Sequence, residues 1–242
     1  MKAWYQINRE WIQTDSLLEA LGPVWPTGGC VTVVGSGGKT SAIFQLAKEL
    51  ASLGKSSIIT TTTHMFREQG ALAVSAEEAR RLILRQTVLM AGRPVGEEKI
   101  TGLAAEEFEQ LRGLADFLLV EADGSKRLPL KLPADHEPVI PEGTERILVL
   151  AGLQGIGRPL SECCHRAELV RELLQAEPDH RMEPEDVRIM LEQGYLNKHI
   201  LPRGIPGVFL LNQADHDGLR TQAMRIADEL SPYPCIITQL RE

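Results

Sequence analysis

The stretch VTVVGSGGKTS (31–41) joins two periodic patterns through a glycine-rich turn. The run CVTVVG (30–35) has no alternation of polar and apolar residues, which predicts a strand buried on both faces. The run TSAIFQLAKELASLG (40–54) repeats apolar residues at helical spacing and ends on Gly54. A strand, a glycine turn and a helix in this order predict a ligand-binding edge, because open α/β sheets bind ligands at the carboxyl ends of their strands.

The chemistry of this turn favours a phosphate. Glycines at 35, 37 and 38 let the backbone adopt positive φ and turn its N–H groups inward. The following helix adds its free amides and the positive end of its dipole. Lys39 can reach the β- and γ-phosphates of a nucleotide, and the Thr40 hydroxyl can bind Mg²⁺. The predicted nucleotide-binding residues of the loop are Gly35, Ser36, Gly37, Gly38, Lys39, Thr40 and Ser41.

The loop departs from the strict G-x-x-x-x-G-K-[ST] pattern, which would place glycine at Val33. Its spacing resembles the shortened loop of the Mur-ligase and folylpolyglutamate-synthase group. It also resembles the deviant loop of the MinD group, although Val34 stands where that group has its signature lysine. A glycine-rich turn that binds nothing is the structural alternative.

Short apolar runs alternate with helical patterns along the rest of the chain. This alternation predicts an α/β protein of the three-layer α/β/α, P-loop NTPase-like class with a mostly parallel central sheet. We expect a single domain over residues 1–242, with a lead-in over 1–27 that contains a short helix at 16–21, and a helical elaboration at one edge over about 153–206. Further strands are expected at 55–66, 87–92, 116–124, 146–152, 207–215 and 234–240, and further helices at 75–86, 104–115, 183–194 and 216–230.

An acidic pair follows one of these strands in FLLVEADGSKR (117–127). Glu121 and Asp123 are two residues apart, so both can face the same side of the strand end. We expect Asp123 to hold Mg²⁺ and Glu121 to orient an attacking water, with the reverse assignment open. Together with Lys39 they form the predicted catalytic set, and Thr40 and Asp123 the predicted metal ligands. A charged turn without a catalytic role is the alternative.

Polar residues at two other strand ends are further candidates. The run TTTTH (60–64) either contacts Mg²⁺ or phosphate or serves only as a good strand former. Lys126 and Arg127 either stabilise a transferring phosphoryl group or are solvated surface charges. In LNQAD (211–215), Asn212 and Asp215 match the guanine-recognition pattern N-K-x-D, but Gln213 replaces its lysine, which leaves ATP or GTP open.

Composition excludes several classes of function. The chain has 242 residues, 43% hydrophobic, and a net charge of −7 without a basic run, which argues against non-specific nucleic-acid binding. It has no signal-peptide pattern and no apolar run long enough to span a bilayer, so we expect a cytoplasmic protein without a membrane partner. Four cysteines show no zinc or disulfide spacing; the adjacent Cys163 and Cys164 are either buried thiols at a helix start or a redox, metal or selenium-handling pair.

Several motifs taken together resemble one family. They are GSGGKTS (35–41), TTTTHMF (60–66), EADGSKRLPLKLPADHEPVIP (121–141), LAGLQGIGRPL (150–160), the pair His165-Arg166, and LNQAD (211–215). These are similar to the YqeC family, described as accessory proteins of selenium-dependent hydroxylases. The resemblance covers about residues 28–240 and implies a nucleotide-binding protein that helps to mature a molybdenum hydroxylase carrying labile selenium. It implies no role for Asp135, His136, His165 or Arg166.

Three functions are compatible with these observations. The first is a Mg²⁺-dependent hydrolase of ATP or GTP whose turnover drives maturation of a selenium-dependent molybdenum hydroxylase. The second is a small-molecule kinase or ligase, suggested by the Mur-like loop, with its acceptor near residues 124–141. The third is a nucleotide switch without catalysis, in which binding orders loops that dock on the hydroxylase.

Overall fold

A single ten-stranded sheet runs through the molecule, in the strand order β2-β1-β15-β14-β12-β3-β10-β4-β7-β6. The computed structural model describes residues 1–67 and 70–240. From β15 to β6 every neighbouring pair is parallel, and β1 and β2 add an antiparallel edge. The predicted mostly parallel sheet is therefore confirmed. Its strands are β1 (Lys2–Ile7), β2 (Glu10–Thr14), β3 (Gly29–Gly35), β4 (Ser57–Thr61), β6 (Leu72–Ala73), β7 (Val88–Ala91), β10 (Phe117–Glu121), β12 (Thr144–Gly152), β14 (Gly207–Asn212) and β15 (Cys235–Gln239).

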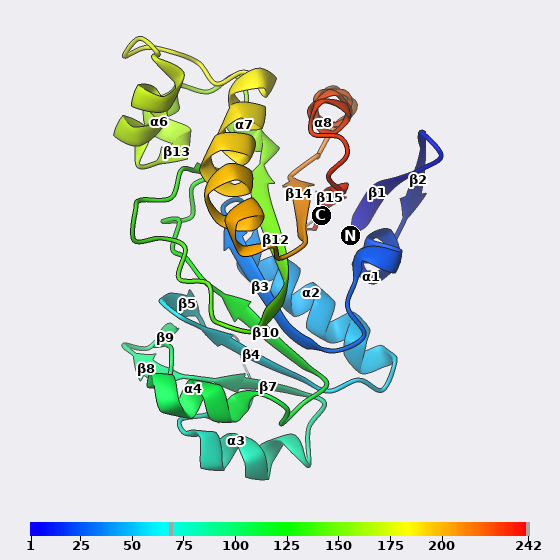
Figure 1. Ribbon diagram of the computed structural model, residues 1–242, viewed down its shortest axis with the longest axis vertical. Coiled ribbons are helices and arrows are strands. Elements are labelled where there is room, and N and C mark those ends of the chain that lie inside the picture. Colours follow the sequence, from blue (N-terminus) through cyan, green and yellow to red (C-terminus); the bar gives the residue numbers. More distant parts are fainter. Residues whose placement is uncertain (68–69, 241–242) are drawn as a thin grey trace.

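Helices cover both faces of the sheet, which confirms the three-layer α/β/α class (Figure 1). On one face, Val31 and Val33 of β3 pack with α1 (Leu17–Leu21) and α2 (Lys39–Ser52). On the other face, two apolar clusters lie beneath α3 (Ala76–Ile83), α4 (Ala105–Leu111), α7 (Pro184–Leu191) and α8 (Asp217–Glu229). Strand residues alternate between these clusters because successive side chains of a strand point to opposite faces. The expected capping residue Ser75 accepts a hydrogen bond from the backbone of Glu78 at the start of α3.

The N-terminal segment contains a β-hairpin that the sequence analysis missed. β1 and β2 turn at Asn8 and Arg9, whose φ values are 51° and 70°. Paired left-handed residues favour a two-residue hairpin turn, although Arg9 is an unusual residue there. The predicted short helix exists as α1, whose first N–H groups at Leu17 and Leu18 donate to the Glu49 carboxylate of α2 at 3.0 and 2.8 Å.

The predicted strand over 55–66 is in fact two strands in different sheets. β4 ends at Thr61, and β5 (His64–Phe66) pairs with β9 (Lys99–Thr101), which also pairs with β8 (Arg93–Val95). The break follows from threonine side chains that bind backbone groups, because the Thr61 hydroxyl donates to the Glu121 carbonyl at 2.7 Å and accepts from the Thr63 N–H at 3.0 Å. Buried Met65 and Ile100 fasten this three-stranded sheet to the main core.

The segment 153–206 lies on a face of the sheet and not at the expected edge. Its strand β13 (Cys164–His165) pairs with β11 (Leu130–Lys131), which precedes the segment in the chain. Its helix α7 packs into the cluster around Ile147 and Phe209 of the central strands. An apolar helical stripe must be buried, and α7 buries Val187 and Met190 in the cluster with these strands. The remaining elements are α5 (Leu160–Cys163), α6 (Ala167–Leu174), a π-helix η3 (Glu192–Ile200), and three short 3-10 turns, η1 (Gly22–Val24), η2 (Leu153–Gly155) and η4 (Leu201–Arg203).

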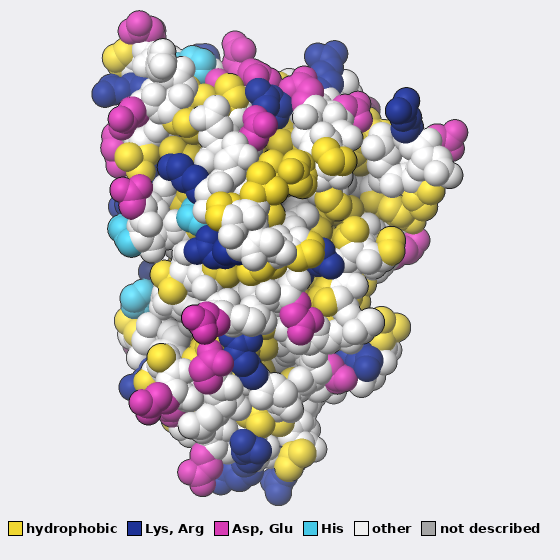
Figure 2. Space-filling model, in the orientation of Figure 1, with side chains coloured by type: hydrophobic (Ala, Val, Ile, Leu, Met, Phe, Trp, Pro, Cys, Tyr) yellow, Lys and Arg dark blue, Asp and Glu magenta, His cyan; other side chains and the backbone are white. Residues whose placement is uncertain are grey.

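Charges of both signs are interspersed over the face shown in Figure 2. Across residues 1–67 and 70–240, no helix combines the length and the apolar content that crossing a bilayer requires.

Candidate functional site

The glycine loop (residues 35–41) connects β3 to α2 at the carboxyl edge of the parallel strands. Gly35, Gly37 and Gly38 have φ values of 93°, 81° and 126°, a region that other L-residues avoid. A Cβ at Gly35 would overlap the Leu150 carbonyl, and one at Gly37 would overlap the backbone of Gly152. The loop therefore needs glycine both for its conformation and for its close contact with β12.

The loop leaves a group of backbone donors for a ligand. The Gly35 N–H donates to the Asp123 carboxylate at 3.1 Å, and the Ser36 N–H donates to the Leu150 carbonyl at 2.9 Å. No described residue accepts a hydrogen bond from the next four N–H groups, at residues 37–40. No side chain caps α2 either. Four donors beside the positive end of a 14-residue helix suit an anion.

Lys39 is folded back onto its own loop. Its Nζ donates to the Gly35 carbonyl at 2.7 Å and lies 3.2 Å from an Asp123 oxygen and 3.3 Å from the Ser125 hydroxyl. The residue is only 4% exposed, yet it lines the cleft described below. Lys39 is thus held at the loop by Asp123, in a position from which its ammonium group can turn to a bound phosphate.

Asp123 belongs to a buried charge cluster, which we define as Lys39, Asp123, Lys131, Glu137 and Arg166. Lys131 is 3.0 Å from Asp123 and 2.9 Å from Glu137, and Glu137 is 2.9 Å from the Arg166 guanidinium. Burial acts to raise the pKa of Glu137, but hydrogen bonds and the charges of Lys131 and Arg166 outweigh it and lower that pKa. The cluster pairs its charges internally, as buried ions must.

The sequence analysis missed Lys131 and Glu137. A signal was present, because Lys131 is the one charged residue in the run LPLKLP (128–133), and lysine is rarely buried without a partner. The identity of that partner was not visible, since Glu137 reaches Lys131 through the loop after β11. Arg166, which pairs with Glu137, comes into place through the β11–β13 pairing.

Glu121 is buried like Asp123 but has different partners. It accepts a hydrogen bond from the Thr40 hydroxyl at 2.8 Å and lines the cleft, whereas Asp123 is not among the lining residues. Burial raises the pKa of Glu121, and the Lys39 charge and the Thr40 hydrogen bond oppose this only in part. A hydroxyl and a carboxylate are hard oxygen donors that fit Mg²⁺, so Thr40 with Glu121 is a better pair of metal ligands than Thr40 with Asp123.

Asn212 supports the loop from below. Its Nδ2 donates to the Gly37 carbonyl at 2.7 Å, and its Oδ1 accepts from the Thr238 hydroxyl at 2.9 Å and from the Leu240 N–H at 3.3 Å. Asp215 is exposed and accepts from the Gln154 amide at 2.6 Å. Both residues line the cleft. Base recognition by Asn212 and Asp215 stays a prediction, with Asn212 already engaged at both ends of its amide.

The threonine run is largely structural. Thr60 donates to the Ala91 carbonyl at 2.8 Å and Thr62 to the Val139 carbonyl at 2.9 Å, while Thr61 braces the end of β10 as described above. His64 is exposed and lines the cleft. Of the five residues in this run, His64 alone faces the space where a ligand would lie.

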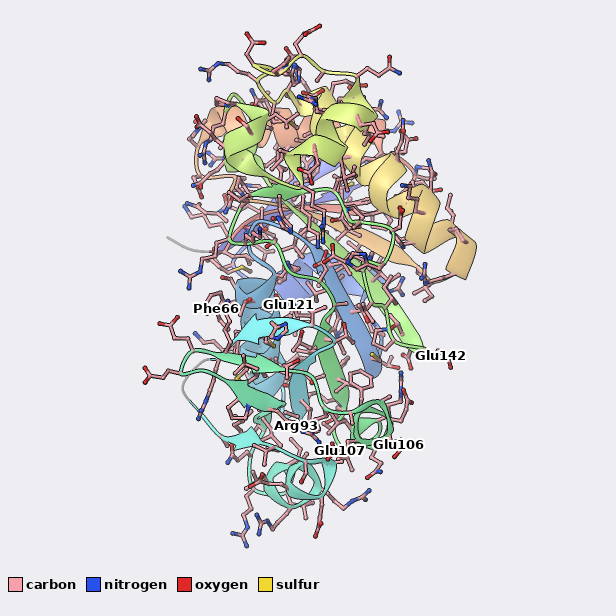
Figure 3. The ribbon with its side chains drawn as sticks, turned by 90° about the vertical axis from the view of Figure 1, so that its left-hand side faces the viewer. Phe66, Arg93, Glu106, Glu107, Glu121 and Glu142 are labelled. Carbon is pink, nitrogen blue, oxygen red and sulfur yellow. The ribbon has the colours of Figure 1, made fainter. Side chains whose placement is uncertain are left out.

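The cleft has a volume of about 1290 Å³ and opens between the glycine loop and the three-stranded sheet β5-β9-β8. Figure 3 shows Phe66 of β5 and Glu121 at the end of β10 close together on this side of the molecule. Within the described chain, no group of three or more His, Cys, Asp and Glu side chains is arranged to hold a metal. A Mg²⁺ ion in the cleft would therefore rely on Thr40, Glu121, water and phosphate oxygens, which is the usual way Mg²⁺ binds with nucleotides.

Other predicted polar residues divide between the cleft and the surface. Lys126, Arg127 and His165 line the cleft, and burial together with the nearby Lys131 and Arg166 charges lowers the pKa of His165. Asp135 and His136 are exposed and do not line it.

The adjacent cysteines lie behind the buried charge cluster. Their sulfurs are 3.8 Å apart where α5 meets β13, and both residues are buried. The contact between the sulfurs lowers the pKa of Cys163 and raises that of Cys164. They do not line the cleft, which favours their interpretation as packed thiols.

These features define a class of protein: a three-layer α/β protein with a glycine-rich loop, a lysine and an acidic strand end at one cleft. Comparison with known proteins identifies the family. The model of the family "YqeC protein" matches residues 31–168, more than half of the chain, and the chain belongs to that family. It is 29% identical over 192 residues to the Escherichia coli (strain K12) protein named "Uncharacterized protein YqeC". The aligned region covers 76% of this chain and 75% of that protein.

Proposed function

We propose that the protein binds a nucleoside triphosphate with Mg²⁺ in the cleft and hydrolyses it, as an accessory factor in the maturation of a selenium-dependent molybdenum hydroxylase. The observation that carries the proposal is the free row of N–H groups at residues 37–40 beside Lys39, with the Thr40–Glu121 pair at the same end of the cleft. Donors, a cation and hard oxygen ligands are the groups that a phosphate tail and its metal require.

The residues of the site would bind the phosphates, hold the metal or take a proton from water, according to where they lie. The N–H groups and Lys39 would bind the terminal phosphates and stabilise charge that develops on them. Thr40 and Glu121 would hold Mg²⁺, which when bound neutralises negative charge on the phosphates. The raised pKa of Glu121 also suits a group that takes a proton from water, while Asp123 acts indirectly by holding Lys39 and the Gly35 N–H.

The accessory role rests on the family and not on the cleft. Membership of the YqeC family supports a protein that assists an enzyme. We infer a cytoplasmic nucleotide-dependent step, with ATP or GTP as the nucleotide and the hydroxylase or its maturation proteins as partners. No membrane or nucleic-acid partner is proposed, consistent with the net charge of −7.

A thermal-shift panel with Mg²⁺ and ATP, GTP or CTP tests binding. A nucleotide at a hundredfold excess over its Kd should stabilise the native state by about 2.7 kcal/mol. We expect Lys39→Ala to lose most of this ligand-induced shift, whatever its own unliganded Tm. Absence of a shift with all three nucleotides would overturn the proposal.

Hydrolysis needs a separate test. Glu121→Gln should retain the Mg²⁺-independent part of the nucleotide-induced shift and lose phosphate release. Thr40→Val should lose the Mg²⁺-dependent part of the shift, and Thr62→Val, at the end of a neighbouring strand but outside the cleft, is the matched control. Phosphate release by Glu121→Gln at the wild-type rate would remove Glu121 from the catalytic set.

One observation favours a second candidate, a small-molecule kinase or ligase. A cleft of about 1290 Å³ exceeds the roughly 300–1000 Å³ that one drug-sized ligand occupies. Mass-spectrometric detection of a phosphorylated or adenylated small molecule would support transfer over hydrolysis.

A further inference from the structure

One wall of the cleft, which begins beside Lys39 of the glycine loop, carries its own concentration of positive charge. We define the cationic wall as Lys99 of β9 together with Lys126 and Arg127 of the turn after β10. All three are exposed and line the cleft. In a chain with a net charge of −7, three cations on one wall of a cavity are a local reversal of sign.

These cations differ in pairing from the lysines of the buried charge cluster. In residues 1–67 and 70–240, no carboxylate forms an ion pair with Lys99, Lys126 or Arg127, whereas Lys39 and Lys131 are each paired. Unpaired cations that share one concave surface retain their attraction for an external anion. The nearby His165 adds a hydrogen-bonding ring whose pKa is lowered by burial and by the surrounding cations.

One aromatic ring, that of Phe66, contacts two of the three cations of the wall. The Arg127 guanidinium lies 4.1 Å from the centroid of the Phe66 ring, and Lys99 Nζ lies 5.0 Å from the same centroid. Phe66 thus holds two like charges near each other through cation–π contacts. A side chain restrained in this way loses less entropy when it binds a ligand.

The backbone of the turn is also unusual. Lys126 and Arg127 have φ values of 50° and 62°, a left-handed conformation that residues other than glycine rarely adopt. Two such residues in succession aim both side chains into the cleft. The turn begins at Ser125, whose hydroxyl is 3.3 Å from Lys39 Nζ, so the wall starts next to the lysine of the glycine loop.

We propose that the cationic wall is a second anion subsite, which binds a small phosphate- or carboxylate-bearing molecule while the glycine loop holds a nucleotide. The inference rests on the proposed nucleotide site and adds a co-ligand to it. The ligand would carry at least two negative charges, matched to the Arg127 fork and the two ammonium groups. Its apolar part would lie against Phe66 and Leu128, which also line the cleft.

The subsite can be tested with inorganic pyrophosphate as the probe. The protein is first saturated with Mg²⁺ and the non-hydrolysable β,γ-imido form of the nucleotide that gives the largest thermal shift. Equilibrium dialysis then measures bound pyrophosphate and retained nucleotide in the same sample. We expect one pyrophosphate per chain with the nucleotide retained.

Variants assign that binding to the wall. Lys99→Gln/Lys126→Asn/Arg127→Asn should weaken pyrophosphate binding at least tenfold and leave nucleotide binding unchanged; asparagine is used because it tolerates the left-handed conformation. Arg9→Asn is the matched control, since Arg9 is an exposed left-handed arginine outside the cleft. Phe66→Leu should give an intermediate loss. Displacement of pyrophosphate by succinate would indicate a carboxylate ligand, and resistance to succinate a phosphate ligand.

Results of two kinds would overturn the subsite. One is unchanged pyrophosphate binding by the triple variant, or none by the nucleotide-loaded wild type. The other is loss of nucleotide along with pyrophosphate, which would assign the wall to the nucleotide itself. If no nucleotide binds at all, the proposed function fails, and pyrophosphate titration of the free protein still decides the wall: the triple variant must lose binding that Lys39→Ala retains.

Discussion

The buried charge cluster and the cationic wall both contain lysine and arginine, but these residues are paired with carboxylates in the cluster and lack such partners among the described residues on the wall. In the buried charge cluster, Lys131 bridges Asp123 and Glu137 at 3.0 and 2.9 Å and is 0% exposed in its side chain. On the cationic wall, Lys126 and Arg127 are exposed and have no carboxylate partner among the described residues. Burial forces charges to satisfy one another and so to maintain the fold, whereas exposure leaves them available for a ligand.

The acidic pair shows a difference in partners within three residues of chain, although both carboxylates are buried. Asp123 faces the cluster behind the loop, and Glu121 faces Thr40 and the cleft. Four substitutions test this division of charges, and they are given in order of decreasing expected effect on stability.

Removal of Lys131 should have the largest effect. Lys131→Met removes the cation that Asp123 and Glu137 share and leaves each carboxylate with one remaining partner, Lys39 or Arg166. Breaking a buried pair from one side costs up to about 3–5 kcal/mol. Urea unfolding measures the change in the free energy of unfolding. Lys126→Asn is the control on the wall, expected within about 0.5 kcal/mol of wild type. Similar losses for both variants would contradict the division into a buried and an exposed side.

Glu137→Gln should come next and should depend on pH. The pKa of Glu137 is lowered in the fold, so its ionised form stabilises the protein above the unfolded carboxyl pKa, and this contribution is lost as pH falls through the folded pKa. We expect a cost of about 1.5–3 kcal/mol at pH 7, the range for hydrogen bonds to charged groups. The difference from wild type should shrink below about pH 4.5, near the ordinary glutamate pKa. A constant difference from pH 7 to pH 3 would argue against an ionised Glu137 in the cluster.

Glu121→Gln should have the opposite sign. The pKa of Glu121 is raised by burial, so the ionised form is disfavoured in the fold, and wild-type stability increases as pH falls through that pKa. At pH 7 the neutral variant should gain about 2–4 °C in Tm, or about 1 kcal/mol for a chain of this size. Differential scanning calorimetry at pH 7 and pH 5 should show the gain decreasing at the lower pH. A loss of Tm at pH 7 would mean that Glu121 stabilises the fold as Asp123 does.

Arg127→Asn should change stability least. Its guanidinium makes a cation–π contact with Phe66 at the surface, worth about 0.5–1 kcal/mol, and asparagine relieves part of the left-handed strain. We expect a net change within about 0.5 kcal/mol by urea unfolding, comparable to Arg9→Asn. A cost above about 2 kcal/mol would show that the wall is structural.

Several elements followed from sequence because their causes are local. The strand before Gly35, the glycine turn and the helix after it depend on apolar spacing and on φ > 0, both of which are written in consecutive residues. The same holds for α8, the last strand and the capped α3. The β1–β2 hairpin was missed because its turn uses Arg9 in place of glycine.

The candidate site divides in the same way. The sequence by itself determined a glycine loop with Lys39 and Thr40 at the carboxyl edge of a parallel sheet, and an acidic pair on a neighbouring strand. Only the tertiary structure decided that Glu121 meets Thr40 while Asp123 meets Lys131, and that Phe66, Lys99 and Arg127 share one wall. The physical reason is that burial and ion pairing depend on contacts between segments far apart in the chain, which spacing along one segment cannot specify.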